Sequence, residues 1–236
     1  MPRTPPHLPP DILPPDFVAR HGLVRRLVTD PAERLTPPHP WAPMTDAEWH
    51  LLRPLLPGST AGGAGRPLAD RRARLDAIFR AVTLKRPAAQ GGGRAPWGAL
   101  PPEYGKADTV ARLFRRWARQ GLWERLLRLV SGRATPLLLG LRWRVCCAFR
   151  RAIRLLGLRA SVLARRLGLF SALPGPSTLV PDPDLSELYQ GVIRRTLDRL
   201  RERPDWRPPR RVWRVFRGML RLAGGRARLP RHLEPA

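Results

Sequence analysis

Four arginines are spaced so that an α-helix would carry them on one face. They are Arg112, Arg115, Arg116 and Arg119. Intervals of three and four residues match the helical repeat of about 3.6. Guanidinium groups bind phosphate oxygens and the edge of guanine through paired hydrogen bonds. The opposite face of the helix is apolar, with Val110, Leu113, Phe114 and Trp117. This pattern favours a helix that enters a DNA groove, and the alternative is an ordinary solvated amphipathic helix.

Carboxylates offer little chemistry in the second half of the chain. Metal-dependent phosphoryl transfer needs several carboxylates that converge on two ions. After Glu124 the acids are Asp182, Asp184, Glu187, Asp198, Glu202, Asp205 and Glu234. The first two flank Pro183 as helix caps do, and Asp198 and Glu202 are spaced for surface pairing with arginines. The five histidines are scattered. We therefore predict that the chain is not an enzyme and holds no metal or cofactor.

The two cysteines, Cys146 and Cys147, are adjacent. This spacing excludes a disulfide framework and a CxxC zinc site. They lie in an apolar helical stretch, which predicts buried structural thiols rather than a nucleophile.

The charge is strongly positive, with 44 Lys and Arg against 18 Asp and Glu, a net of +26. No Asp or Glu occurs from Arg125 to Pro181. Such a charge favours a polyanionic partner, either nucleic acid or an anionic membrane face. Codon bias in a GC-rich genome would supply arginine without selection for binding, so charge alone predicts only weak, salt-dependent attachment.

The longest uncharged stretch, residues 167–181, contains three prolines and is too short to span a bilayer. The N-terminus is proline-rich rather than apolar, so we predict no signal peptide and no integral membrane segment. Together with the cysteine usage, this predicts a cytoplasmic protein, associated with the nucleoid if it binds DNA.

The patterns that must position these residues are helical. Thr45 and Glu48 form a capping box that opens a first helix. Further helices are predicted over 70–84, from Asp108 or Thr109 to Gly121, and over 122–130. Later candidates span 137–156, 160–170, 185–203 and 209–223.

Strand patterning is nearly absent, so the predicted fold is all-α: a helix-turn-helix-like bundle followed by further amphipathic helices. We predict three regions. Residues 1–43 form a Pro-rich disordered arm, with a short helix conceivable over 16–28. Residues 44–132 form a helical DNA-binding domain, and 133–236 form a basic helical region of unknown role. The segment Pro174-Gly175-Pro176 is the strongest internal break.

An ordered series of short motifs runs through the block 44–130. It comprises Met44-Thr45-Asp46-Ala47-Glu48-Trp49, Leu52-Arg53-Pro54-Leu55-Leu56-Pro57, Gly65-Arg66-Pro67, Asp70-Arg71-Arg72, Leu75-Asp76-Ala77-Ile78, Pro96-Trp97, Leu100-Pro101-Pro102-Glu103-Tyr104-Gly105, Thr109-Val110, Phe114-Arg115-Arg116-Trp117 and Gly121-Leu122-Trp123-Glu124. In this series the block resembles the N-terminal helical domain of transposases of the IS-four/IS-five group.

The resemblance implies a helix-turn-helix-like module that recognises the ends of a mobile element on double-stranded DNA. We add Arg71 and Arg72, from the motif Asp70-Arg71-Arg72, to the DNA-binding candidates. In such families a catalytic domain follows, whose Asp, Asp and Glu hold two Mg²⁺ ions, and we expect it to be absent here. A second departure is the loop 86–97, which is longer than the family's Gly-Cys-Pro-Trp-like turn and lacks its cysteine. This loop puts the spacing of the helices and sequence-specific recognition in question.

The leading hypothesis is a transposase-derived DNA-binding protein without its own catalytic domain. The catalytic transposase subunit would then be separately encoded, or the chain would be a regulator or a degenerate remnant. The alternative is a helical interaction protein that binds a partner or an anionic membrane surface.

Overall fold

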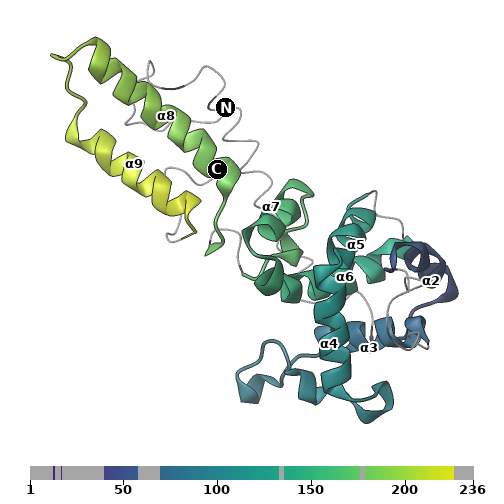
Figure 1. Cartoon of the computed structure of the whole chain (residues 1–236). Helices are drawn as coiled ribbons and strands as arrows, with labels where there is room; N and C mark the ends of the chain where they lie inside the picture. The colour runs from purple at the N-terminus through teal and green to yellow at the C-terminus, as the bar shows by residue number, and fades with distance from the viewer. Residues whose placement is uncertain are drawn as a thin grey trace. The chain divides into compact units, whose positions relative to one another are not determined.

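The computed structural model describes residues 13, 17, 40–57, 70–132, 136–175 and 179–225, without the side chains of 136, 137 and 139. The fold is all-α, as predicted (Figure 1). Within these ranges, β-structure is limited to one isolated antiparallel bridge, between Lys85 and Arg94. The chain divides into two compact units, residues 31–174 and residues 1–30 with 175–236. Each unit is described by itself.

The first helix of the larger unit, α2 (Asp46–Leu52), begins at the predicted capping box. The Thr45 hydroxyl accepts a bond from the Glu48 amide at 3.2 Å, and the Glu48 carboxylate accepts one from the Thr45 amide at 2.9 Å. Two of the orphan amides at the helix start are thereby satisfied. A 3₁₀ turn, Arg53–Leu55, follows.

The next described helices are α3 (Arg71–Thr83), α4 (Ala107–Arg119) and α5 (Leu122–Val130). The predicted caps of α4, Asp108 and Thr109, are wrong. The 3₁₀ turn Pro102–Tyr104 ends at Gly105, and Lys106 takes the cap position without a side-chain bond. Asp108 instead lies in the first turn, where its charge favours the helix dipole.

The boundary between α4 and α5 is at Gly121, as predicted. Its φ of +72° is left-handed, a conformation that glycine adopts without the steric cost of a Cβ.

The long helix α6 (Pro136–Leu156) lies at the centre of this unit and packs against α2, α3, α4 and α5 (Figure 1). Its side chains Leu141, Val145 and Phe149 are fully buried. The helix α7 (Leu158–Arg166) and the 3₁₀ turn Phe170–Ala172 complete the unit.

The larger unit ends at Pro174, within the Pro174-Gly175-Pro176 break, and α6 supplies core to the helices before it. The domain boundary at 132/133 stays a prediction.

The smaller unit is built on two contacting helices, α8 (Pro183–Glu202) and α9 (Arg210–Ala223). Asp182 caps α8 by accepting a bond from the Leu185 amide at 3.1 Å. The apolar faces of both helices form one core, which Leu13 and Phe17 join. The apolar stripe of α8 is interrupted, since Leu197 is exposed and the Thr196 hydroxyl, bonded to the Val192 carbonyl, is buried instead.

Except for Leu13, Phe17 and 40–43, the predicted Pro-rich arm lies outside the described residues, as does the helix predicted over 16–28 beyond Phe17. Within the described ranges, every helix is too short or too polar to cross a membrane.

Candidate nucleic-acid interface

The helix α4 carries the predicted arginine face. All four arginines, Arg112, Arg115, Arg116 and Arg119, are exposed. The opposite face is core, with Val110, Phe114 and Trp117 at most 3% exposed. This core anchors the helix, because the Trp123 indole donates a bond to the Phe114 carbonyl at 3.3 Å and stacks near its ring. The arginines can therefore contact a ligand without disturbing the packing.

Arg71 and Arg72, the other two candidates, have internal bonding partners. The Arg71 guanidinium donates to the Pro57 carbonyl, and Arg72 donates to the Asp46 carboxylate and the Met44 carbonyl. Both side chains are half-buried. Their bonds tie the start of α3 to α2 and its flanks, so these two arginines are less available to DNA than those of α4.

The long loop between α3 and α4 is closed upon itself. The Arg86 amide donates to the Gly93 carbonyl at 2.9 Å, and the Ala95 amide donates to the Leu84 carbonyl at 3.0 Å. At its tip Gly91, Gly92 and Gly93 all have positive φ angles. Because α3 and α4 still pack directly against each other, the longer loop does not separate the two helices.

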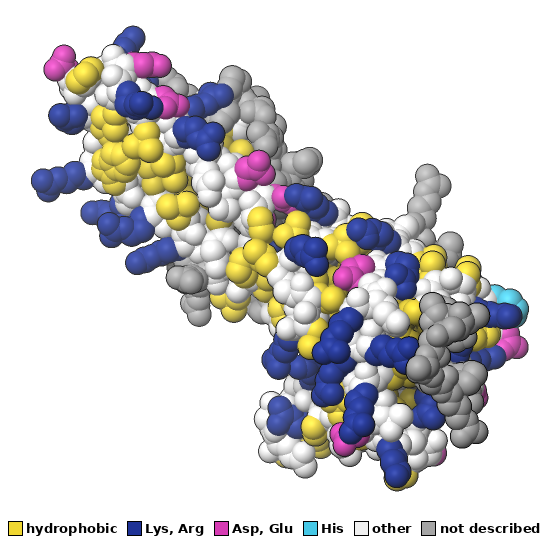
Figure 2. Space-filling model, viewed as in Figure 1, with side chains coloured by type: hydrophobic (Ala, Val, Ile, Leu, Met, Phe, Trp, Pro, Cys, Tyr) yellow, Lys and Arg dark blue, Asp and Glu magenta, His cyan; other side chains and the backbone are white. Residues whose placement is uncertain are grey.

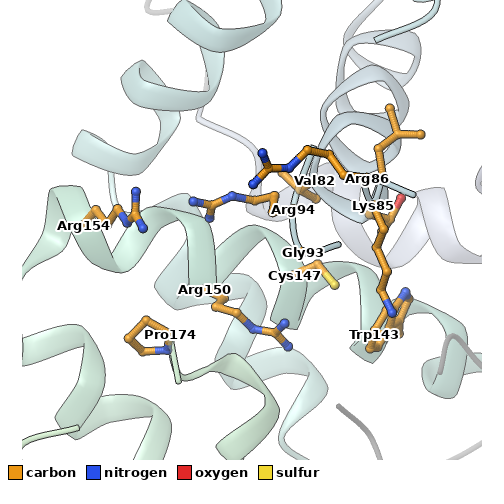
Figure 3. Close-up of a pocket in the computed structure, with 12 residues that line it drawn as sticks. Val82, Lys85, Arg86, Gly93, Arg94, Trp143, Cys147, Arg150, Arg154 and Pro174 are labelled. Atoms are coloured by element: carbon orange, nitrogen blue, oxygen red, sulfur yellow. The ribbon is translucent and has the colours of Figure 1, made fainter. Parts of the chain in front are cut away.

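A basic cavity of about 490 Å³ lies beside this loop and was not predicted (Figure 3). Its cationic lining residues are Lys85, Arg86, Arg94, Arg150 and Arg154. The first three come from the loop and the last two from successive turns of α6. The acid-free stretch after Glu124 was the one sequence feature that indicated a basic site on α6. The cavity itself forms only because the fold brings the loop against α6.

A smaller cavity of about 210 Å³ connects this cluster with α4. It shares Arg94 and Arg154 with the larger cavity and adds Arg115 and Arg151. The side chain of Arg115 thus belongs both to the exposed face of α4 and to this cavity. The space-filling view shows Lys and Arg side chains spread widely over the visible face of the described chain (Figure 2).

The crowding of these cations affects their proton affinity. Burial, together with the like charges of Arg94, Arg154 and Arg115, lowers the pKa of Arg151 to about 10. Burial, with Arg154 and Arg150, also lowers the pKa of Arg94. At neutral pH both remain protonated, so the cluster is a concentrated positive charge that an anion would stabilise.

The two cysteines are buried, as predicted, and neither is in a disulfide. Burial raises the pKa of the Cys147 thiol to about 11, so it is a neutral thiol at pH 7. In the part of the chain that the structure describes, no three His, Cys, Asp or Glu side chains gather as metal ligands.

The arrangement is that of a helical domain with exposed arginines on an anchored helix, and the comparisons with known proteins agree with the sequence resemblance. Residues 44–127 match the family described as "Putative transposase of IS4/5 family". This matched segment covers α2 to most of α5 and is similar to that family.

The uncharacterized protein y4sN of Sinorhizobium fredii is a relative that is 31% identical to this chain over 91 residues. The matched region covers 39% of this chain and 65% of that protein. No solved structure matches the chain significantly.

Proposed function

We propose that this chain is a transposase-derived protein that binds double-stranded DNA and recognises the ends of a mobile element through α4. The observation that carries the proposal is the anchored helix whose free face holds four exposed arginines. The family match of residues 44–127 supports it. The net charge of +26 supports attraction to the phosphate backbone. Its site of action would be the cytoplasm, at the nucleoid.

The proposal assigns recognition to this chain and strand transfer to a separately encoded transposase subunit. Among the described residues, most acids after Glu124 belong to α8: Asp182 caps it, and Asp198 and Glu202 lie exposed on it, while Asp205 lies in the turn that follows. Such positions suit capping and surface pairing rather than a carboxylate cluster that holds two ions.

The test compares two arginine pairs of equal charge. Arg115→Ala with Arg116→Ala should leave the free energy of unfolding nearly unchanged, because exposed substitutions usually cost less than about 0.5 kcal/mol. It should weaken binding to an element-end duplex more than to a random duplex, by about 1–3 kcal/mol per lost base contact. The measurement is a gel-shift titration over a salt series.

The matched control is Arg194→Ala with Arg195→Ala, a pair of exposed arginines on α8. It should lower the affinity for both duplexes by a similar small factor. If both variants weakened binding equally and preserved the preference for the element end, α4 would be an ordinary basic surface. If the affinity were flat between low and physiological salt, nucleic-acid binding itself would be wrong.

A second candidate function, binding an anionic membrane surface or a partner protein, rests on α9. Trp213 and Leu220 are 41% and 44% exposed at a spacing of seven residues, and Arg217 lies exposed between them. An apolar stripe flanked by arginines suits a lipid interface. Co-sedimentation with anionic vesicles at moderate salt, lost on Trp213→Ala, would favour this function over DNA binding.

A further inference from the structure

We propose that the basic cavity between the 85–94 loop and α6 is a phosphate-binding site. Its ligand would be a phosphate group of a nucleic-acid backbone, with a free inorganic polyphosphate as the other source of the same chemistry. Five cationic side chains line this concave site, and among the described lining residues of the two cavities none is Asp or Glu.

The geometry gathers arginines from two distant segments. The guanidinium groups of Arg94 and Arg154 point toward each other, and that of Arg86 lies nearby (Figure 3). A phosphate has several acceptor oxygens, so it can bridge guanidinium groups that approach it from different sides. An anion between Arg94 and Arg154 would also offset the repulsion that now acts between them.

The arginines of this cluster differ in how they are bonded. Arg150 donates to the Ser171 carbonyl, and Arg151 lies over the Trp97 ring with 3.8 Å from guanidinium carbon to ring centroid. These contacts hold the base of the site in place. Among the described residues, Arg94 and Arg154 have no side-chain hydrogen bond or ion pair, so their donors are available to a ligand.

Arginines with a structural role in the same unit have acidic partners. Arg72 is bonded to the Asp46 carboxylate, and Arg144 lies 3.6 Å from the Glu48 carboxylate. Each pairs with an acid. The cavity brings positively charged side chains together without an acidic residue among those that line it. This arrangement costs folding free energy and is typical of a site whose counter-charge is supplied by the ligand.

The site also extends the DNA-binding face. Arg115 of α4 lines the smaller cavity together with Arg94 and Arg154. For the backbone source of phosphate the inference rests on the proposed function, because the strand held by α4 would continue into the cavity. Contacts of this kind fix the register of a duplex without reading its sequence.

The experiment uses the full chain and the variant Arg94→Ala with Arg154→Ala, beside the control Arg194→Ala with Arg195→Ala. One arm measures binding of a random duplex over a salt series. Each lost phosphate contact lowers the slope of log K against log salt by about 0.9, so the cavity variant should lose nearly two units. The control should lose less, because its arginines do not converge on a common ligand.

The other arm measures thermal unfolding with inorganic pyrophosphate. The wild-type chain should be stabilised, since a ligand that binds only the folded state raises its stability, and the cavity variant should not be. Without ligand, the variant should unfold at or above the wild-type temperature, because repulsion is removed. That readout shows whether it is folded.

The outcomes separate the two proposals. If the cavity variant has a lower salt slope for duplex binding, the site is assigned to the nucleic-acid backbone. If the variant loses only the stabilisation by pyrophosphate, the site is assigned to a free polyphosphate. If the folded cavity variant matches wild type in both arms, the phosphate site is wrong, whether or not α4 binds DNA. If wild type binds no duplex, the proposed function fails while the pyrophosphate arm still decides the cavity.

Discussion

The two units use similar helices in different ways. Both contain amphipathic, arginine-rich helices, and α4 and α9 resemble each other in composition. In the larger unit the helices surround α6, and arginines from α4, α6 and a loop converge on shared cavities. In the smaller unit α8 and α9 pack on each other, and α9 leaves Trp213 exposed. Charge density is therefore common to both units, and in the larger unit cationic side chains also converge on shared cavities.

The difference has a physical origin in the number of neighbours. A helix that is surrounded on several sides fixes the directions of its polar side chains, as α6 does for Arg150 through the Ser171 carbonyl. A helix with one neighbour buries one stripe and leaves the remaining side chains in solvent. The following predictions test this contrast, beginning with the largest expected effect.

Shortening the chain should break the larger unit completely. A chain of residues 40–132 retains the family segment but lacks α6, so the core side chains of α5, including Leu126 and Leu127, lose their cover. We expect no cooperative thermal transition and loss of the near-ultraviolet circular dichroism of the tryptophans.

The matched control is a chain of residues 40–174, which keeps α6 and α7. It should unfold cooperatively with a stability close to that of the larger unit in the full chain. Cooperative unfolding of the 40–132 chain would show that α6 is an accessory and that the predicted boundary at 132/133 describes the folding unit.

The second prediction contrasts two tryptophans on arginine-rich helices. Trp117 of α4 is 3% exposed, so Trp117→Ala should lower the free energy of unfolding by about 3–5 kcal/mol through cavity formation. Trp213 of α9 is 41% exposed, and Trp213→Ala should cost less than about 1 kcal/mol. Urea unfolding measures both, and equal costs would contradict the contrast between the two units.

The sequence was informative wherever the determinant is local. The capping box at Thr45, the glycine at 121 and the apolar face of α4 follow from short-range spacing, and the structure contains all three. The start of α4 was misplaced because Asp108 and Thr109 are the residue types that usually cap helices, whereas the observed cap residue, Lys106, makes no side-chain cap bond that a sequence pattern could indicate.

The basic cavity was beyond local analysis. Arg94 and Arg154 are sixty residues apart, and neither stands out among 42 arginines. Their proximity depends on the packing of α6 against the helices before it, which no periodicity predicts. The same holds for Arg72, whose carboxylate partner Asp46 lies on another helix. In a chain so rich in arginine, composition predicts the partner's charge, and only tertiary structure separates binding arginines from structural ones.

The last prediction concerns the buried ion pair that joins the family segment to α6. Arg144 and Glu48 lie 3.6 Å apart, with side chains 4% and 7% exposed, and Arg144 also packs over the Trp41 ring. Glu48→Gln keeps an oxygen that can accept the Thr45 amide but removes one of the carboxyl charges near Arg144, and leaves the interaction with Asp76. We expect a cost of about 1–3 kcal/mol in urea unfolding, below the 3–5 kcal/mol typical of well-formed buried pairs, because the 3.6 Å distance is long for a hydrogen bond.

The double variant Glu48→Gln with Arg144→Met separates the charge from the shape. Methionine fills a similar volume and needs no counter-charge, so the double variant should recover part of the stability lost by Glu48→Gln alone. If the two substitutions were simply additive, the pair would carry no coupling. The attachment of α6 to residues 44–127 would then rest on apolar packing. Whether the fold of residues 44–127 depends on α6 would be tested by the shortened chains alone.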